Sequence, residues 1–267
     1  MTAGRLTTMQ NKQARSPFDL TGQVALVTGA SRGIGLAACR ALAAAGADII
    51  GASRRMTESC ADLAAELGQL GREFEARNVD MGDRASVAEL ADAMLGRERP
   101  VDVLVNNAGI IRRGPAAAHS AQDWDQVVAA DLSGPFFLAQ SLGRQMVQRR
   151  RGRIIFTASL LSFQGGINVI SYAAAKSGVL GMTRAFANEW APHGVNVNAV
   201  VPGYIATDVT AVLRADPERN RSITERIPAG HWGAPEDVAG TIVFLASPAS
   251  AYVCGAAIPV DGGWLSR

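Results

Sequence analysis

The fold is decided by the stretch Val24-Ala25-Leu26-Val27-Thr28-Gly29-Ala30-Ser31-Arg32-Gly33-Ile34-Gly35. Its apolar start, residues 24–27, is typical of a strand buried on both faces of a parallel sheet. The Ala- and Leu-rich residues 36–45 predict a helix that ends at Gly46, and residues 47–52 predict a second strand. Between them, the glycines let the backbone turn tightly and approach a pyrophosphate at the helix N-terminus. In this strand–turn–helix–strand context, a dinucleotide site is a better interpretation than an incidental turn.

The end of the second predicted strand indicates which dinucleotide binds. An acidic residue there usually binds the free ribose 2′-hydroxyl of NAD(H), whereas arginine suits the 2′-phosphate of NADP(H). Residues 53–55 read Ser-Arg-Arg. Arg54 is the best candidate for the phosphate, with Arg32 as a second donor, because a guanidinium binds two phosphate oxygens at once. We therefore expect NADP(H); NAD(H), with both arginines merely solvated, is the open alternative.

Strands and helices alternate along the rest of the chain. Further strands are predicted at 73–80, 101–105, 153–157, 195–201 and 256–260, and helices at 57–70, 84–95, 123–150 (partly interrupted), 172–190 and 235–246, with a charged helical segment at 214–226 over the site. This order predicts an α/β, single-domain Rossmann fold over residues 18–267, with a doubly wound parallel sheet of about seven strands and helices on both faces. Residues 1–17 are expected to form a mobile N-terminal extension.

Polar and small residues follow two of these strands, at the sheet edge where such folds bind ligands. Asp80 could hydrogen-bond the adenine region of a nucleotide, or it could cap the helix at 84–95. The amides of Asn106 and Asn107 need partners at a buried strand end. The small Ala108 and Gly109 would let a flat ring approach closely.

Composition excludes several classes of protein. The 267 residues carry 26 Lys and Arg against 24 Asp and Glu, so 26 − 24 gives a formal charge of +2, which is no footprint for nucleic acid or an anionic membrane. The three cysteines and three histidines are scattered and have no metal-ligand or disulfide spacing. No apolar run reaches the ~20 residues of a membrane span. We expect a cytoplasmic protein with a small-molecule substrate and no metal.

A tyrosine and a lysine stand one helical turn apart in Ser171-Tyr172-Ala173-Ala174-Ala175-Lys176. This i, i+4 spacing puts both side chains on one helix face. An unperturbed tyrosine has a pKa of about 10, and a nearby ammonium favours its phenolate form. Tyr172 could then exchange a proton with a substrate oxygen. By itself the spacing is weak evidence, and an ordinary solvated helix would be the favoured interpretation.

Taken together, the motifs resemble the short-chain dehydrogenase/reductase family over nearly the whole chain after residue 18. The resemblance lies in the glycine turn (Thr28, Gly29, Gly33, Gly35), the Asn-Asn-Ala-Gly segment 106–109, Ser159, the Tyr172–Lys176 pair, and Pro202, Gly203 and Thr207. It implies that Ser159 holds the substrate oxygen, Tyr172 exchanges its proton, and Lys176 lowers the pKa of Tyr172 and binds the nicotinamide ribose. It also implies a homotetramer. The implied cofactor contacts are Gly29, Ser31, Arg32, Gly33, Ile34, Gly35, Ser53, Arg54, Asp80, Asn107, Ala108, Gly109, Tyr172, Lys176, Pro202, Gly203, Ile205 and Thr207.

One position departs from the family pattern. Family members commonly carry an asparagine in the helix before the catalytic strand, where it helps to hold a water of the proton relay together with the lysine. Asp131 occupies that place. An ionised aspartate accepts hydrogen bonds but donates none. We expect Asp131 to act in catalysis, to pair with Lys176 or to order a water, and Asp131→Asn to keep most of the activity.

The second half of the chain resembles a branch of the family that acts on sugar acids such as 3-deoxy-gluconate derivatives. Arg112 and Arg113 follow a strand end near the expected nicotinamide, and an arginine can clamp a carboxylate with two hydrogen bonds. With Ser159, Tyr172, Gln164 and Arg214 they form the expected substrate site; surface or intersubunit ion pairs are the alternative for each arginine. Two other functions stay open. One is a 3-oxoacyl thioester reductase, and the other is a cofactor-sensing protein without turnover.

Overall fold

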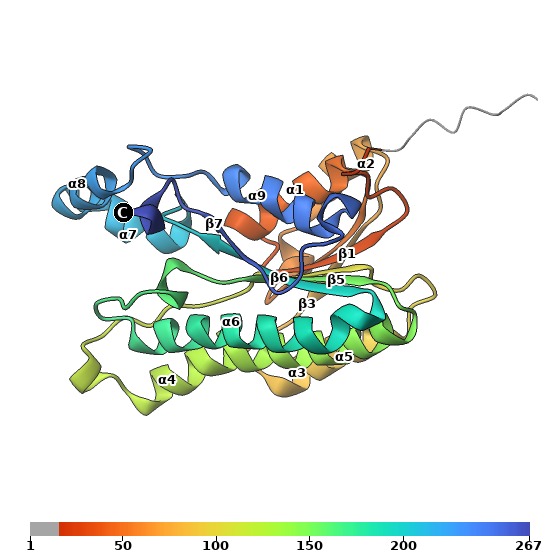
Figure 1. The fold of residues 1–267 in the computed structure, drawn as a ribbon, viewed down its shortest axis with the longest axis horizontal. Coiled ribbons are helices and arrows are strands. Elements are labelled where there is room, and N and C mark those ends of the chain that lie inside the picture. The colour runs from red at the N-terminus through yellow and green to blue at the C-terminus, as the bar shows by residue number, and fades with distance from the viewer. Residues whose placement is uncertain (1–15) are drawn as a thin grey trace, which may run out of the picture.

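The computed structural model describes residues 16–267 (Figure 1). Residues 1–15 of the extension expected over residues 1–17 therefore lie outside the described residues. Pro17 is held in place, because its carbonyl accepts a hydrogen bond from the Ala249 N–H at 2.9 Å. Within the described part of the chain, no helix combines the length and apolar character needed to cross a membrane.

Seven parallel strands form one sheet, as the sequence predicts, and their order in the sheet is β3-β2-β1-β4-β5-β6-β7. The sheet reverses its direction of growth between β1 and β4, and ligands of such folds bind outside the carboxyl ends of the strands at that point. The strands are β1 (Val24–Thr28), β2 (Asp48–Ser53), β3 (Phe74–Asn78), β4 (Val103–Asn106), β5 (Gly152–Thr157), β6 (Val195–Pro202) and β7 (Ala257–Val260).

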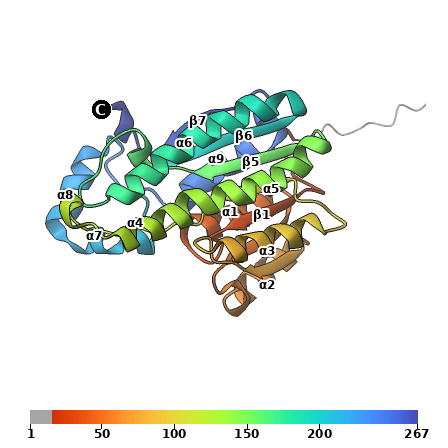
Figure 2. The ribbon, with the colours of Figure 1, turned by 90° about the horizontal axis from the view of Figure 1, so that it is seen from below.

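Helices cover both faces of this sheet (Figures 1 and 2). Two separate apolar cores result, one on each face. One face carries α1 (Gly33–Ala44), α2 (Ala61–Gln69) and α9 (Pro235–Ala246), and the other carries α3 (Arg84–Leu95), α5 (Gly134–Gln148) and α6 (Ile170–Trp190), with α4 (Ala121–Val128) leading into α5. The short helices α7 (Ala211–Ala215) and α8 (Pro217–Arg226) lie at one end of the molecule, beside the C-terminus (Figures 1 and 2).

Two predicted helices differ in detail from the structure. The first helix begins at Gly33, three residues earlier than expected, because the last glycines of the turn already have helical hydrogen bonding. The segment 57–70 is divided into a 3₁₀ turn at Met56–Glu58 and α2. The Asn78 side chain accepts a hydrogen bond from the Thr57 N–H at 3.1 Å and holds that turn against β3.

The long helix expected over 123–150 is interrupted by a π-helical turn, η3 (Ala129–Ser133), between α4 and α5. A side chain at Gly134 would overlap the Met81 carbonyl oxygen, so only glycine lets α5 begin this close to the neighbouring loop. Turns of this kind are frequent at functional sites. Here the turn places Asp131 inside the protein, 1% exposed.

Candidate active site

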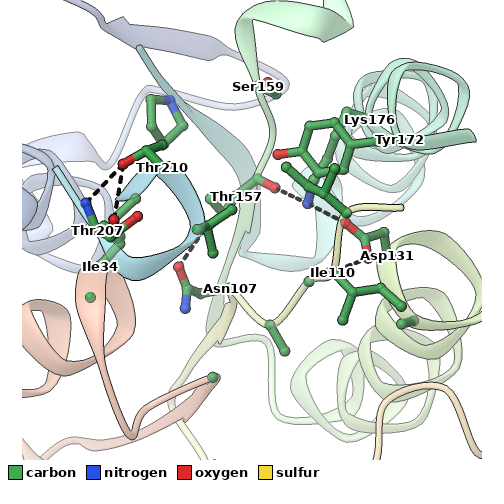
Figure 3. Close-up of a pocket in the computed structure, with 18 of the residues that line it drawn as sticks. Ile34, Asn107, Ile110, Asp131, Thr157, Ser159, Tyr172, Lys176, Thr207 and Thr210 are labelled. Atoms are coloured by element: carbon green, nitrogen blue, oxygen red, sulfur yellow. Dashed lines mark hydrogen bonds and ion pairs between the residues drawn. The ribbon is translucent and has the colours of Figure 1, made fainter. Parts of the chain in front are cut away.

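A cleft of about 1500 Å³ opens at the carboxyl ends of the strands. Its walls come from the glycine turn after β1, the segments that follow β2 to β6, and the first two turns of α6. Figure 3 shows Tyr172, Lys176 and Asp131 along one wall, with Ile34 and Thr207 across the cleft from them. Every cofactor contact expected from the sequence lines this cleft except Gly35.

The glycine turn owes its shape to its glycines. Gly29 and Gly33 have φ values of 69° and 54°, in the left-handed region that favours glycine. A side chain on Gly29 would lie 2.9 Å from the Asn107 side-chain nitrogen. Gly35 faces inward, where a side chain would overlap the Gly29 carbonyl oxygen. The expectation that Gly35 contacts the cofactor is therefore corrected: it lets α1 pack against the turn and does not line the cleft.

The Asn-Asn-Ala-Gly segment is tied to this turn through Thr28. The Thr28 hydroxyl accepts hydrogen bonds from the backbone N–H groups of Asn107 and Ala108 at 3.0 and 3.1 Å. The Asn107 side chain donates to the Thr28 carbonyl at 3.1 Å. Asn106 is buried, and within residues 16–267 its amide has no hydrogen-bond partner. Asn107 is thus the amide that fixes the two loops on which a dinucleotide would lie.

The two arginines expected at a 2′-phosphate are in different situations. Arg54 lines the cleft and has no ion-pair partner in the described part of the chain. Arg32 pairs with Asp208 across the cleft mouth at 3.2 Å, with both side chains exposed. Asp80 also lines the cleft, and it does not cap α3, because Asp83 accepts the hydrogen bond from the Ala85 N–H. Because its guanidinium lines the cleft beside the end of β2, Arg54 remains the better candidate for a phosphate ligand.

Ser159, Tyr172 and Lys176 meet in the cleft from two elements. Ser159 follows β5, and its hydroxyl accepts a hydrogen bond from the Leu161 N–H at 3.2 Å. Lys176 lies one turn after Tyr172 on α6, with Nζ 5.5 Å from the tyrosine ring centroid. Its ammonium donates to the Thr157 carbonyl at 3.0 Å (Figure 3). The ordinary solvated helix is excluded, because Lys176 is only 4% exposed.

Asp131 reaches the same cluster from η3. One carboxylate oxygen, Oδ1, accepts a hydrogen bond from the Ile110 N–H at 2.8 Å. The other, Oδ2, lies 3.4 Å from Lys176 Nζ. A side chain on Gly109 would be 2.7 Å from Oδ2, so glycine makes room for the carboxylate. The possible pairing of Asp131 with Lys176 is therefore present in the structure.

The pKa of Tyr172 departs from the sequence-based expectation. Burial raises the pKa of the phenol above its ordinary value, and the Asp131 charge raises it further. Lys176, Ser159 and Arg113 oppose this rise but do not overcome it. The expectation of a net acidic phenol is therefore wrong, although Lys176 acts in the expected direction. For Lys176 itself, burial lowers the pKa, but Asp131 and Tyr172 outweigh burial and raise it overall.

The residues expected to bind the substrate differ in their contacts. Arg112, Arg113 and Gln164 line the cleft, but Arg112 is already bound to Gln126 at 3.0 Å and to Asp123 at 3.5 Å. Arg113 has no ion-pair partner within residues 16–267, and its charge acts on Tyr172. Arg214 is corrected: it does not line the cleft, and its guanidinium donates to the Thr207 carbonyl at 3.1 Å.

Two further lining residues were not predicted as part of the site. Arg219 and Trp264 line the cleft, with Arg226, whose guanidinium lies 4.0 Å above the Trp264 ring centroid. Arg219 has no ion-pair partner among the described residues. The sequence signal was the charged segment 214–226, which was expected over the site. The sequence could not tell which face of that segment turns inward.

The comparisons with known proteins agree with this geometry. The family model described as short chain dehydrogenase matches residues 23–218. The chain belongs to this family. The predicted class, an NAD(P)-dependent oxidoreductase of the short-chain dehydrogenase/reductase family, is thereby confirmed.

Individual relatives extend over nearly the full chain. A 2-dehydro-3-deoxy-D-gluconate 5-dehydrogenase from Pseudoalteromonas atlantica is 49% identical over 94% of this chain and 98% of its own length. A crystal structure from Agrobacterium tumefaciens, provisionally assigned as a 2-deoxy-D-gluconate 3-dehydrogenase and containing bound NADP, has a TM-score of 0.89 at 47% identity and covers 95% of this chain and 100% of that one. A 3-oxoacyl-[acyl-carrier-protein] reductase from Synechocystis is 42% identical over 91% of this chain and 97% of its own length. The predicted resemblance to the deoxygluconate dehydrogenase branch is confirmed.

Proposed function

We propose that this protein transfers a hydride between NADP(H) and a carbonyl or secondary alcohol of a sugar acid of the 2-dehydro-3-deoxy-gluconate class. The observation that carries the proposal is Arg113. It lines the cleft, acts electrostatically on Tyr172 and has no ion-pair partner within the described residues. A guanidinium held there without a counter-ion suits a substrate carboxylate placed beside the reacting oxygen. Arg219 and Arg226 also line the cleft and add positive charge to it.

The residues of the cleft have distinct parts in this reaction. Ser159 hydrogen-bonds the reacting oxygen and holds it near the Tyr172 hydroxyl. During reduction, Tyr172 donates its proton to that oxygen, and Lys176 stabilises the phenolate that remains. The nicotinamide supplies or accepts the hydride, which is the chemistry that the protein side chains lack. The glycine turn and the loop fixed by Asn107 provide backbone surface for the dinucleotide.

Arg54 supports NADP(H) over NAD(H). We expect Arg54→Ala to raise the KM for NADPH about tenfold to a hundredfold, because a charge-assisted hydrogen bond to phosphate contributes about 1.5–3 kcal/mol. The KM for NADH, which lacks the phosphate, should change less than twofold in the same variant. Steady-state kinetics with both cofactors measure this. Equal effects on the two cofactors would remove the phosphate role.

Arg113 and Arg112 form a matched pair for testing the carboxylate site. We expect Arg113→Ala to raise the KM for a keto sugar acid about tenfold or more, and to change the KM for its neutral amide little, because only the acid loses an ion pair. Arg112→Ala should have a smaller effect on both, since Asp123 and Gln126 already bind its guanidinium. If Arg113→Ala weakened the acid and the amide equally, the carboxylate would have to bind elsewhere.

The charge of the cleft also distinguishes the proposed sugar-acid enzyme from a thioester reductase. A 3-oxoacyl thioester reductase needs an apolar channel for its acyl chain, whereas Arg113, Arg219 and Arg226 all line this cleft. A screen of keto and hydroxy acids and of acetoacetyl thioesters against both cofactors, followed at the nicotinamide absorbance, tests the choice. We expect turnover with the sugar acids. Turnover with the thioesters alone would favour the reductase, and cofactor binding without any turnover would favour a sensor.

The cellular location and the oligomeric state of the protein are proposed from the sequence and not from the cleft. We infer a homotetramer from the family resemblance, and a cytoplasmic location from the three scattered cysteines, which suit a reducing compartment. Analytical ultracentrifugation of the purified protein tests the assembly, and a monomer at micromolar concentration would contradict it.

A further inference from the structure

The Asp131 carboxylate is placed among groups that suit its ionised form. Its Oδ1 accepts the Ile110 N–H at 2.8 Å, and its Oδ2 faces the Lys176 ammonium at 3.4 Å. No hydrogen-bond acceptor for a carboxyl proton lies at Oδ2 in the part of the chain that the structure describes. A neutral carboxyl would leave its O–H unpaired in a site that is 1% exposed. Burial raises the pKa of Asp131 above its ordinary value overall, and Lys176 and the Ile110 N–H limit that rise without cancelling it.

The Tyr172 hydroxyl is surrounded by charges from three elements. Lys176 comes from its own helix, Arg113 from the loop after β4, and Asp131 from η3. His119 contacts the residue next to Tyr172: its ring nitrogen lies 3.0 Å from the Ser171 hydroxyl. The two cations favour the phenolate, and Asp131 is the one anion among the described residues that opposes them. Without Asp131, the positive charge of Lys176 would act on the phenol uncompensated.

We propose that Asp131 is a positioning residue that partly neutralises Lys176 and so makes the Tyr172 phenol harder to deprotonate. The proposal depends on the proposed function only in giving Tyr172 the role of proton donor. The π-helical turn and Gly109 hold the carboxylate in place, so this compensation is fixed by the fold. Its functional consequence is a phenol that is ready to give its proton to a carbonyl oxygen as hydride reaches the carbonyl carbon. Alcohol oxidation, which needs the phenolate, is shifted to higher pH.

The test is the titration of Tyr172 itself. The chain has three tyrosines, so the ultraviolet phenolate signal of the wild type minus that of Tyr172→Phe isolates this one. The same difference is measured between Asp131→Asn and the double variant Asp131→Asn/Tyr172→Phe. We expect Asp131→Asn to lower the Tyr172 midpoint by about one pH unit, which is the usual size for removing a nearby charge. The pH profile of kcat for alcohol oxidation should move by the same amount in the same direction.

Controls separate this effect from a structural one. Asp92→Asn removes one negative charge from the exposed face of α3 and should leave the Tyr172 midpoint unchanged. If Asp131→Asn does not fold, Asp131→Ser provides a second neutral variant. A Tyr172 midpoint that stays the same or rises in the neutral variant overturns the proposal. The titration needs no substrate, so a shifted midpoint in a protein that fails to turn over sugar acids would contradict the proposed function only.

Discussion

Tyr172→Phe is expected to lower kcat about a thousandfold, because positioned proton donors contribute about 10²–10⁴-fold to such reactions. The phenyl ring keeps the packing of the tyrosine on α6, so the variant should fold normally. Lys176 and the glycine turn stay intact, so the affinity for NADPH should change less than twofold. Steady-state rates, together with NADPH binding followed by its fluorescence, measure both quantities.

The matched control for this variant is Tyr252→Phe. Tyr252 is fully exposed and does not line the cleft, so its replacement should leave kcat unchanged. If Tyr172→Phe kept more than about a tenth of the wild-type kcat, another group would have to supply the proton. A loss of NADPH binding in the same variant would point to a structural defect and not to catalysis.

Lys176→Met is expected to lower the free energy of unfolding by about 3 kcal/mol at pH 7, because it leaves a buried carboxylate without its cation. Asp131 is 1% exposed and has no acidic or basic partner other than Lys176 among the described residues. Urea unfolding at constant pH measures this loss. The double variant Lys176→Met/Asp131→Asn should recover most of it, since the amide needs no counter-ion, and should remain within about 1 kcal/mol of Asp131→Asn alone.

The pH dependence of this stability loss has a definite sign. In the folded protein the pKa of Asp131 is already raised by burial, and removing Lys176 raises it further. A carboxyl whose pKa is higher in the folded than in the unfolded protein lowers the free energy of unfolding at pH values above its ordinary pKa, because the group is then ionised in the unfolded chain. The deficit of Lys176→Met should therefore shrink as the pH falls from 7 toward about 4. A deficit that persists at low pH and in the double variant would show that Lys176 acts through packing and not through Asp131.

The positions of the strands and of most helices along the chain could be predicted because they depend on local signals. The glycines of the first turn permit only a narrow set of backbone shapes, and the apolar run before them suits only a buried strand. A partial interruption of the helix at 123–150 was also expected, although not its place at residues 129–133. Its π-helical form was not, because that form depends on the contact between Gly134 and the Met81 carbonyl from another loop.

The site was predictable as a set of residues but not in its electrostatics. The Tyr172–Lys176 spacing predicts proximity, and the structure places both in the cleft. The direction of the Tyr172 pKa was wrong because burial and the Asp131 charge both come from the tertiary fold. Arg214 and Arg219 show the same limit: the sequence places both near the cleft, but the bend between α7 and α8 decides that Arg219 lines it and Arg214 does not.

The most direct measurement is the initial rate of NADPH oxidation with a keto sugar acid, compared between the wild type and Tyr172→Phe at saturating cofactor. We expect steady turnover by the wild type and about a thousandfold slower turnover by the variant, with equal NADPH affinity in both. Comparable rates in the two proteins would contradict the assignment of Tyr172 as the proton donor in this cleft.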